Sequence, residues 1–523
     1  MFSKLQYSIL IYCTIIICIF DYRTDATNVT FIPTPIRITV ADLPAPFTTQ
    51  SANKDGNIIP VPSDPQISVS VGFTVKLFID DLITPRFLLY TPTGDILVSE
   101  PSANRISCLV DSNNDGYPDE RITFADASNK ISRPYGMAFI KGYFYVANSN
   151  GIRRYPWIRA SRQISGEGEQ IMDIDPSGHW TRVITMSPTA DKIYIGIGSA
   201  TNNDADPLPR ASVQLANLDG SNRTTFAFGL RNPIGLAFHP VSNELYVACQ
   251  ERDGLRVITM SPTADKIYIG IGSATNNDAD PLPRASVQVA NLDGSNRTTF
   301  AFGLRNPIGL AFHPVSNELY VACQERDGLG DNLVPDFFTR IRQDEFYGWP
   351  YAYMSPNLTD PKHTLSNGSS VRPDLVARTR TPDVLIQAHS AVLDMLFYTG
   401  NQFPSSYKNG AFAAFHGSWN REVGTGYKIV FIPFNNDNRP MGHYEDFVDG
   451  FLTNPRGPDT FATPVGLLVL KDGSLIFTED GNNRIYQVQY QQSTSNSHCQ
   501  HFVSVVFLII WQLFSFLFKH EIN

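Results

Sequence analysis

The sequence predicts an all-β protein that folds as a six-bladed β-propeller over residues 65–490. Helical periodicity is scarce, and the apolar residues alternate in short runs broken by Gly, Pro, Asn and Asp. A unit of two strands around a tight turn also returns six times, once a duplicated segment is left out. Each unit is followed by residues for two more strands, and four-stranded repeats are typical of propeller blades, because a lone blade cannot bury both faces. A β-sandwich would explain the alternation but not the repeated unit.

The six strand pairs are recognised by two apolar runs on either side of a turn. They are, in chain order, PRFLLYTPTGDILVSEP from Pro85, RPYGMAFIKGYFYVANS from Arg133, RVITMSPTADKIYIGIGS from Arg182, NPIGLAFHPVSNELYVACQ from Asn232, SAVLDMLFYTG with GAFAAFHGS from Ser390, and TPVGLLVLKDGSLIFTED from Thr463. The segments NRISCLVD and NRIYQVQY supply later strands of the first and last blades.

A duplication interrupts this regularity. Residues 182–255 recur 74 positions later as residues 256–329, and the copies differ only where Leu215 becomes Val289. The insert adds roughly one and a half blades, and a closed propeller has no place for half a blade without exposing an edge. Either the extra strands pack irregularly, or the duplication is a very recent event or an error of sequence assembly.

The two ends of the chain predict export and tethering. Residues 1–26 have a lysine, an apolar run and then small and polar residues, which is the layout of a secretory signal peptide, and residues 27–64 form a Pro-rich lead-in. A polar spacer, 491–501, precedes a hydrophobic tail, 502–518, which fits a GPI-type lipid-anchor signal or a single membrane span. Both alternatives place the protein on the extracellular face of a membrane. Five N-x-[ST] sequons are compatible with a glycoprotein: Asn28, Asn222, Asn296, Asn357 and Asn367.

Charge and cysteine content exclude several classes. The formal net charge is −9 and Lys/Arg runs are lacking, which argues against nucleic acid as a partner and favours a neutral or weakly charged small molecule. The six cysteines provide no disulfide framework, no C-x-x-C metal site and no C-x-x-C-H haem site.

Four segments together resemble the glucose/sorbosone dehydrogenase family, especially its pyranose and sorbosone dehydrogenase branch. They are GHWTRVITMSPTADKIYIGIGS, FGLRNPIGLAFHPVSNELYVACQERDGLGDNL, EFYGWPYAY and AFAAFHGSWNREVGTGYKIVFIPF, and the likeness runs from about Gly72 to Tyr490. The resemblance implies a six-bladed propeller that uses pyrroloquinoline quinone and calcium to oxidise a sugar at C1 by hydride transfer to the quinone. Because no haem motif is present, the electrons would pass to an external acceptor.

His179 is the candidate base. Oxidation of a sugar at C1 requires removal of the hydroxyl proton, and an imidazole suits that role near neutral pH. The resemblance implies this role for the histidine of the G-H-x-x-R segment. The alternative is a loop histidine that bonds a neighbouring strand. The second copy has Asp253 at the equivalent position, so only the first junction carries a base.

The motif GLRNP occurs in both copies, with Arg231 and Asn232 in the first and Arg305 and Asn306 in the second. A cofactor with three carboxylates calls for a guanidinium and an amide donor. The resemblance implies that this pair contacts quinone and substrate. The alternative is a capped turn between blades, where Asn-Pro is common.

The resemblance implies that two further segments bind the cofactor and the metal. The backbone carbonyls of Asp327 and Gly328 are implied as calcium ligands, in keeping with the preference of calcium for oxygen. His416, Asn420 and Arg421 occupy the region where other branches of the family hold the quinone with a lysine, so binding by Asn420 and Arg421 is a looser inference. The side chains of Glu325 and Asp331 could equally be solvated loop charges.

A second calcium site is conceivable in the segment DSNNDGYPDE. Oxygen-bearing side chains have an EF-hand-like spacing there, but an isoleucine occupies the place of the bidentate glutamate. An Asn/Asp-rich hairpin turn is an equal alternative. The residues concerned are Asp111, Asn113, Asp115 and Asp119.

The leading hypothesis is therefore a sugar dehydrogenase dependent on pyrroloquinoline quinone. Two alternatives are a calcium-dependent lactonase on the same fold and a surface-tethered binding module that has kept the propeller and lost the chemistry.

Overall fold

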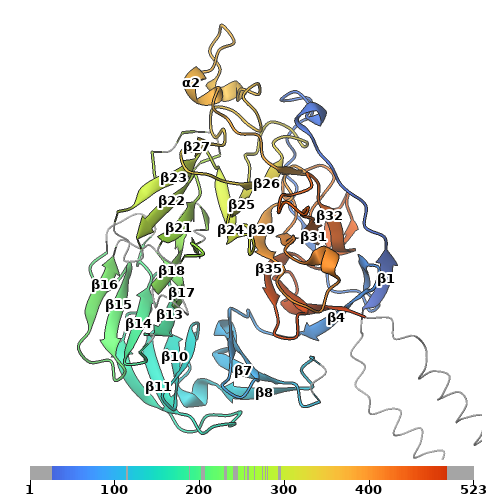
Figure 1. Cartoon of the computed structure of the whole chain (residues 1–523). Helices are drawn as coiled ribbons and strands as arrows, with labels where there is room; N and C mark the ends of the chain where they lie inside the picture. Colours follow the sequence, from blue (N-terminus) through green and yellow to red (C-terminus); the bar gives the residue numbers. More distant parts are fainter. Residues whose placement is uncertain are drawn as a thin grey trace, which may run out of the picture.

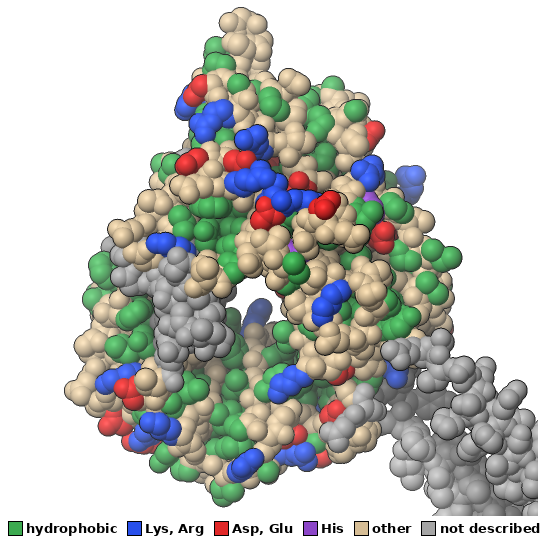
Figure 2. Space-filling view, in the orientation of Figure 1, with side chains coloured by type: hydrophobic (Ala, Val, Ile, Leu, Met, Phe, Trp, Pro, Cys, Tyr) green, Lys and Arg blue, Asp and Glu red, His purple; other side chains and the backbone are tan. Residues whose placement is uncertain are grey.

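The computed structural model describes residues 26–491 except 114–115, 188, 202–205, 229–231, 239–244, 252–253, 256–257, 264–265, 274, 277, 280 and 292–295. These residues form nine β-sheets, eight of which follow one another around a central opening (Figure 1). The opening persists in the space-filling view (Figure 2). Within each of the eight sheets the chain meanders from an inner strand beside the opening toward the rim, which is the arrangement of a β-propeller.

The first three sheets are regular and four-stranded. The first contains β5 (Phe87–Tyr90), β6 (Ile96–Glu100), β7 (Arg105–Val110) and β8 (Glu120–Ala125). The second contains β9 (Met137–Ile140), β10 (Tyr143–Asn148), β11 (Gly151–Pro156) and β12 (Glu169–Asp173). The third contains β13 (Arg182–Met186), β14 (Lys192–Ile197), β15 (Ser212–Asn217) and β16 (Thr224–Phe228).

The next two sheets arise from the repeat. The fourth has three strands, β17 (Pro233–Phe238), β18 (Leu245–Glu251) and the two-residue β19 (Gly254–Leu255). The fifth contains β20 (Ile258–Met260), β21 (Lys266–Ile271), β22 (Ser286–Asn291), β23 (Thr298–Phe302) and, parallel to β23, β27 (Glu345–Phe346).

The last three sheets complete the ring. The sixth contains β24 (Asn306–Phe312), β25 (Leu319–Gln324), β26 (Asp336–Arg340) and β28 (Val384–Ile386). The seventh contains β29 (Val392–Phe397), β30 (Ala411–Phe415), β31 (Lys428–Ile432) and β32 (Glu445–Asp449), extended by β3 (Gln66–Ser70) and β1 (Thr27–Phe31). The eighth contains β35 (Pro464–Val469), β36 (Leu475–Glu479), β37 (Arg484–Tyr490) and β4 (Phe73–Ile79).

The smaller elements connect or flank the ring. A ninth, small sheet joins β2 (Asn57–Ile58), β34 (Asp459–Thr460) and β33 (Leu452–Asn454). The α-helix α2 (Pro373–Val376) lies in a segment that projects from the ring (Figure 1). The 3-10 turns are η1 (Val40–Asp42), η2 (Pro101–Ala103), η3 (Ala127–Asn129), η4 (Pro361–His363) and η5 (Ser405–Tyr407).

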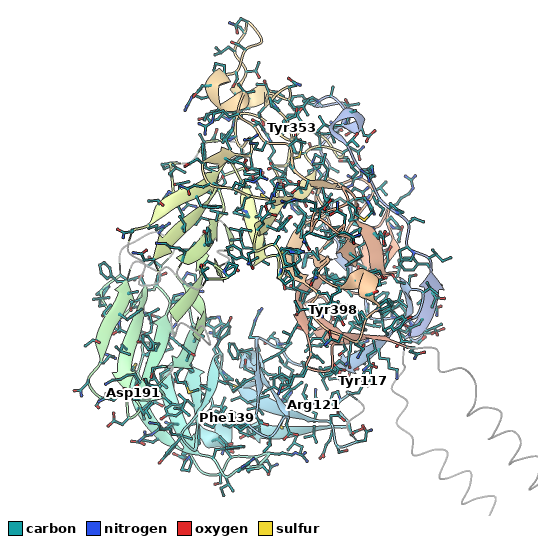
Figure 3. The ribbon with its side chains drawn as sticks, in the orientation of Figure 1. Tyr117, Arg121, Phe139, Asp191, Tyr353 and Tyr398 are labelled. Atoms are coloured by element: carbon teal, nitrogen blue, oxygen red, sulfur yellow. The ribbon has the colours of Figure 1, made fainter. Side chains whose placement is uncertain are left out.

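Aromatic and aliphatic side chains pack between neighbouring sheets. Phe124 of the first sheet meets Phe144 of the second edge-to-face at 4.9 Å, and Phe139 joins the same cluster (Figure 3). Between the seventh and eighth sheets, Tyr398 stacks on Phe403 at 4.5 Å. Because each sheet buries its faces only against its neighbours, the strands need apolar residues on both faces. This requirement explains the short, dense apolar runs of the sequence.

The ring closes by joining the two ends of the described chain. β4, which precedes the first sheet, pairs antiparallel with β37 over Phe73–Ile79 and becomes the outer strand of the eighth sheet. Phe78 and Ile79 then pack with Val98 and Leu109 of the first sheet. The strand that closes the ring therefore contacts both sheets at the seam.

The predicted strand pairs are confirmed, since all six form antiparallel hairpins. The six-blade count is not confirmed: the described residues of the ring make seven sheets of four or more strands and the three-stranded β17–β19 sheet. The duplicated strands enter the ring instead of packing outside it. The Pro-rich lead-in also contributes to the fold, because β1 pairs with β3 and β2 pairs with β34.

The predicted ends fall almost wholly outside the described residues. The signal peptide before Ala26, the spacer after residue 491 and the tail 502–518 belong to this group. Across the described part of the chain, no helix has the length and apolar character needed to cross a membrane.

A half-buried carboxylate joins the seventh and eighth sheets. Asp394 on β29 accepts hydrogen bonds from the backbone N–H groups of Met395 and Leu467, at 2.8 Å each. Burial raises the pKa of Asp394 from 3.8 to about 6, against the opposing effect of those two bonds. Because the folded-state pKa is the higher one, the stability contributed by this group is fully present below about pH 4. It is lost as the pH rises through about 6.

We predict that Asp394→Asn, which resembles the protonated acid, gains stability relative to the wild type as the pH rises from 4 to 7. The gain should reach roughly 3 kcal/mol, because each pKa unit corresponds to 1.36 kcal/mol. Thermal or urea unfolding of both proteins at pH 4 and pH 7 measures the difference in stability between them. Titrating groups other than Asp394 contribute equally to both proteins and cancel in this difference. A difference that stays constant with pH, or that grows in favour of the wild type, would contradict this role of Asp394.

Candidate functional site

The candidate residues gather at one end of the ring because of how the inner strands run. Each inner strand starts at the same end, so the residues just before these strands face one another around the opening. His179 precedes β13, Asn232 precedes β17, and Asn306 begins β24. The loop after β30, which starts at His416, reaches the same end. Charged side chains and a histidine are visible along one margin of the opening (Figure 2).

In the first copy, His179 and Asn232 lie together around Gly198. A Cβ on Gly198 would fall 2.4 Å from Asn232 Oδ1 and 2.7 Å from His179 Cβ, so glycine is required for this approach. The His179 N–H donates to the Ser199 carbonyl at 2.9 Å, and Thr181 Oγ1 donates to Asn232 Oδ1 at 2.7 Å. The structure thus unites the candidate base with the asparagine of the first GLRNP motif. Arg231 lies outside the described residues.

In the second copy, Arg305 and Asn306 belong to the sixth sheet. Arg305 Nη1 donates to the Glu325 carbonyl at 3.0 Å, and its guanidinium lies 6.0 Å from the ring centre of Trp349. Asn306 Nδ2 donates to Gln324 Oε1 at 3.1 Å. Arg305 Nε and Asn306 Oδ1 are buried and have no hydrogen-bond partner among the described residues.

Asp327 is the centre of a polar cluster beside these residues. Its carboxylate accepts hydrogen bonds from the Asn276 side chain at 2.6 Å and from Asn420 Nδ2, and lies 3.3 Å from His389 Nδ1. Burial acts to raise the pKa of Asp327, but the bonds from His389 and Asn276 outweigh it and lower the pKa. Burial likewise opposes protonation of His389, whereas the bonds to Asp327 and Gly330 raise its pKa overall. Asp327 and the buried His389 therefore form a close pair in which each shifts the pKa of the other toward its charged form, and single-motif reasoning had not joined them.

The acids on either side of Asp327 are buried, and the suggestion that they are solvated loop charges is wrong. Burial raises the pKa of Glu325 from 4.5 to about 8. Burial also raises the pKa of Asp336 to about 6, although it accepts bonds from the N–H groups of Glu325 and Ala391. Asp331 accepts from the N–H groups of Ala52 and Glu422. These bonds tie the lead-in and the loop after β30 to the Asp327 loop.

The loop after β30 contacts two parts of the site. His416 Nε2 lies 3.1 Å from Asp480 Oδ1, while Asn420 bonds Asp327. Arg421 donates to Asn332 Oδ1 at 2.9 Å and to the Val423 carbonyl at 3.1 Å. Because Arg421 is buried among these loop oxygens, the structure gives it a role in holding the loop.

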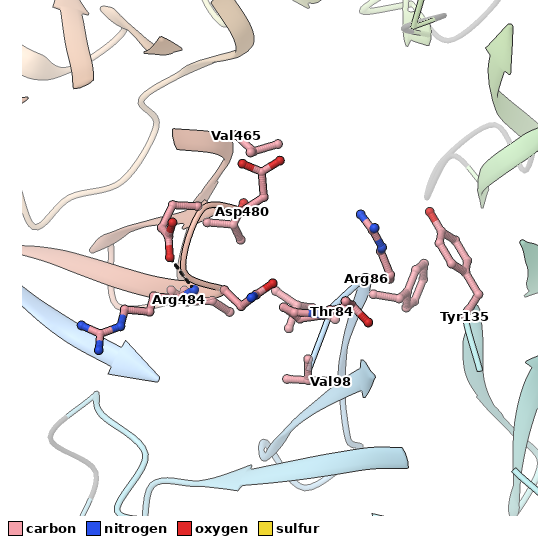
Figure 4. Close-up of a pocket in the computed structure, with 14 residues that line it drawn as sticks. Thr84, Arg86, Val98, Tyr135, Val465, Asp480 and Arg484 are labelled. Atoms are coloured by element: carbon pink, nitrogen blue, oxygen red, sulfur yellow. Dashed lines mark hydrogen bonds between the residues drawn. The ribbon is translucent and has the colours of Figure 1, made fainter. Parts of the chain in front are cut away.

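A cavity of about 440 Å³ opens between the first and eighth sheets at this end of the ring. Arg86 extends into it between Asp480 on one side and Tyr135 on the other (Figure 4). Tyr135 also contacts Trp180 edge-to-face at 6.0 Å, which connects the cavity to the neighbour of His179. Sequence reasoning missed this cavity, and the only signal was the acidic pair that ends the predicted strand SLIFTED.

The residues around Asp327 fit a cofactor that carries carboxylates. The buried polar atoms that have no hydrogen-bond partner among the described residues include Arg305 Nε, Asn306 Oδ1, Trp349 Nε1 and Asn420 Oδ1. The two N–H groups can donate to carboxylate oxygens, and the amide oxygens are hard ligands of the kind that calcium takes.

The predicted main-chain ligands are partly engaged. The Asp327 carbonyl accepts a bond from Arg326 Nε at 3.0 Å, and Gly328 has a φ of +86°, which favours glycine. Within the described ranges, no group of three or more His, Cys, Asp or Glu side chains is arranged to hold a metal. Calcium at this site would therefore depend on main-chain and amide oxygens.

The acidic loop at Asp111 is closed by its own hydrogen bonds. Asp119 Oδ2 accepts from the Ser112 N–H at 2.8 Å, and Asp111 Oδ2 accepts from the Gly116 N–H at 2.9 Å. Asn113 Nδ2 donates to Asp119 Oδ1 at 3.0 Å. This geometry is typical of an Asx-stabilised turn. Asp115 lies outside the described residues, and calcium in this loop stays a prediction.

Comparison with known proteins gives a family match and distant relatives. The family model described as TrAA12-like matches residues 67–265 and, again, residues 256–491. The second match starts where the second copy of the repeat starts.

An uncharacterized protein of Borreliella burgdorferi is 35% identical over 239 residues, which cover 45% of this chain and 60% of that protein. The pyrroloquinoline quinone-dependent pyranose dehydrogenase of Coprinopsis cinerea is 22% identical over 468 residues, which cover 81% of this chain and 54% of that protein. The chain thus spans little more than half the length of these relatives. A solved iodide structure of a Trichoderma reesei enzyme of Carbohydrate-Active Enzymes Family AA12 aligns with 83% of this chain and 100% of its own, at 17% identity and a TM-score of 0.44.

We predict that Asp360→Ala destabilises the protein by about 3–5 kcal/mol, because it leaves Arg326 buried without its carboxylate. Arg326 Nη1 lies 2.6 Å from Asp360 Oδ2, both side chains are buried, and Arg326 also holds the Asp327 carbonyl. The double variant Arg326→Met with Asp360→Leu should recover most of the loss, because it removes both charges. Urea unfolding of the three proteins measures this. Equal losses in the single and double variants would refute the buried-pair explanation.

Proposed function

The chain belongs to the TrAA12-like family, and from this premise we propose that it is a pyrroloquinoline quinone-dependent sugar dehydrogenase that oxidises a pyranose or another aldose at C1. The observation that carries the proposal is the group of buried, unpartnered polar atoms around Asp327. Leaving such groups unpaired costs about 1–3 kcal/mol each, so their presence favours a polar ligand at this place.

Arg305, Asn306 and Asn420 would hold the quinone, and the oxygens at Asp327 and Gly328 would hold calcium. The quinone and calcium, when bound there, would supply an acceptor for the C1 hydride and a Lewis acid that polarises this acceptor. Arg305 can bond a carboxylate through Nε while Nη1 keeps its bond to the Glu325 carbonyl. The Asp327–His389 pair would keep the Asn420 amide oriented, since Asn420 Nδ2 bonds Asp327 and lies 3.0 Å from His389 Nδ1.

His179 would remove the proton of the C1 hydroxyl. Its backbone bond to Ser199 and its contact with Gly198 fix the start of this segment, while Trp180 packs against Tyr135 at the wall of the cavity. A pyranose would enter through this cavity, where Arg86 and Asp480 offer a hydrogen-bond donor and an acceptor for sugar hydroxyls.

The duplication separates the two halves of the proposed site. His179 adjoins Asn232 at the first boundary of the repeat, whereas Arg305, Asn306 and Asp327 lie beyond the β17–β19 and β20–β23 sheets. This separation also favours a second candidate function, a surface-tethered binding module that retains the ligand site but has little turnover. Turnover and ligand binding measured together distinguish the two.

We further propose that the protein acts at the extracellular face of a membrane and passes electrons to an external acceptor. Four sequons, at Asn222, Asn296, Asn357 and Asn367, are exposed and suit glycosylation. Asn28 suits it poorly, because its amide donates to Ala26 and Val75 and accepts from Val75. The proposed tether rests on the sequence of the C-terminal tail.

We predict that pyrroloquinoline quinone with calcium raises the melting temperature of both the wild type and His179→Ala, whereas the variant loses about 10²–10⁴-fold in dye-linked sugar oxidation. A ligand bound only by the folded state stabilises it by about 2.7 kcal/mol at 100 times Kd, and loss of a general base gives a rate penalty of that size. A melting shift without turnover in the wild type would identify the binding module. Undiminished turnover in the variant would show that His179 is structural.

We predict that deletion of residues 182–255 preserves or raises the melting temperature and increases turnover. The deletion removes the β13–β16 and β17–β19 sheets, so the β20–β23 sheet follows His179 and brings Asn306 into the place of Asn232. In the full chain, Arg305→Ala should weaken cofactor binding more than its matched control, Arg231→Ala. An unfolded or aggregated deletion variant beside an active full chain would show that the extra strands are integral.

A further inference from the structure

The duplication provides an internal comparison of one strand in two settings. β16 and β23 have the same sequence, Thr-Thr-Phe-Ala-Phe, and each is the fourth strand from the inner edge of its sheet. Their pairing is also the same: Ser212 faces Phe228 in the first copy as Ser286 faces Phe302 in the second, with a bulge one position further on in each. Differences between the two strands therefore come from their surroundings.

In the second copy the outer edge of this strand is occupied. β27 pairs with β23 in parallel, with Ala301 opposite Glu345 and Phe302 opposite Phe346. The N–H groups of residues 344, 347 and 349 donate to the carbonyls of residues 300, 302 and 303 at 2.7, 2.9 and 3.0 Å. The Phe346 ring lies 5.0 Å from Phe302. The strand is thus competent to accept another strand along this edge.

In the first copy the segment equivalent to β27 is missing, because residues 345–346 lie outside the duplicated segment. Within the residues that the structure describes, no strand follows β16 in its sheet, and Figure 1 shows β16 at the outer rim of the ring. Phe226 is 43% exposed and Phe228 is 78% exposed. The strand contains neither proline nor charge, which are the usual means of protecting an edge from pairing.

We propose that β16 is a dimerisation edge that pairs antiparallel with β16 of a second copy of this chain. The chain's own β27 is engaged on β23, whereas no strand among the described residues pairs with the outer edge of β16. In the register that places Phe226 opposite Phe226, residues 224, 226 and 228 direct their backbone N–H and C=O groups toward the partner strand. The two strands then exchange about six backbone hydrogen bonds. Phe228 then packs beside Thr224 of the other chain.

The symmetry of this contact favours a dimer. Identical strands that pair about a two-fold axis form a closed contact, so assembly stops at two chains and does not continue into fibres. An edge of five residues is short compared with a standard interface of about 1,600 Å², so the dimer should be weak and dependent on concentration. The exposed sequon at Asn222 precedes the strand, so the proposed dimer is the state of chains that carry no glycan at Asn222.

The test is sedimentation velocity on the full chain produced without glycans, from about 1 to 100 μM, a range that covers dissociation constants typical of weak contacts. The wild type should show a dimer fraction that rises with concentration. Phe228→Lys should weaken dimerisation at least tenfold, about 1.4 kcal/mol, because it removes the ring that packs beside Thr224 of the other chain and places a lysine on the edge, where a charge opposes strand pairing. Ile158→Lys is the matched control: Ile158 is also 78% exposed but lies outside β16, so this variant should dimerise as the wild type does.

Three results would overturn the proposal. The wild type could remain monomeric across the range, or Phe228→Lys could dimerise like the wild type. The third result would be that the wild type is monomeric and binds a synthetic peptide with the sequence of residues 343–353, whereas the Phe228→Lys variant does not bind this peptide. That result would show that the edge accepts a segment like β27 from a different partner.

Discussion

Closure of the ring is the constraint on which the remaining structure depends. Each sheet buries its faces only against its neighbours, so an open ring would expose two apolar faces at once. β4 prevents this by pairing with β37 and completing the eighth sheet before the chain begins the first. The contact between these two sheets is nevertheless less complete than a packed core, because cavities of about 440 and 380 Å³ lie along the seam.

Closure also decides which residues can meet. Because the inner strands all start at one end, loops from several sheets reach the same end of the ring, and buried carboxylates connect the loops of the sixth and seventh sheets with the lead-in. Asp331 joins the lead-in to the loop after β30, and Asp336 joins the loops before β29 and after β25. A buried carboxylate is costly unless it is hydrogen-bonded, so the backbone N–H donors are what allow these two side chains to remain inside the protein.

The repeat shows how strongly surroundings act on identical residues. The pair Tyr194 and Phe226 in the first copy keeps the edge-to-face contact of Tyr268 and Phe300 in the second, at 5.1 and 4.9 Å. Local packing within a sheet is therefore conserved between the copies. The outer edges of the two sheets differ, because the covering strand β27 follows only the second copy.

The sequence by itself determined the strand pairs and their order, because alternation and turn residues act over a few positions. It could not determine the number of sheets, since a repeated segment has the same local pattern whether it enters the ring or is excluded from it. It also could not join Asp327 with His389, or Arg86 with Asp480, because these pairs are distant in the chain. Only the tertiary structure decided those contacts, through the common direction of the inner strands and the closure of the ring by β4.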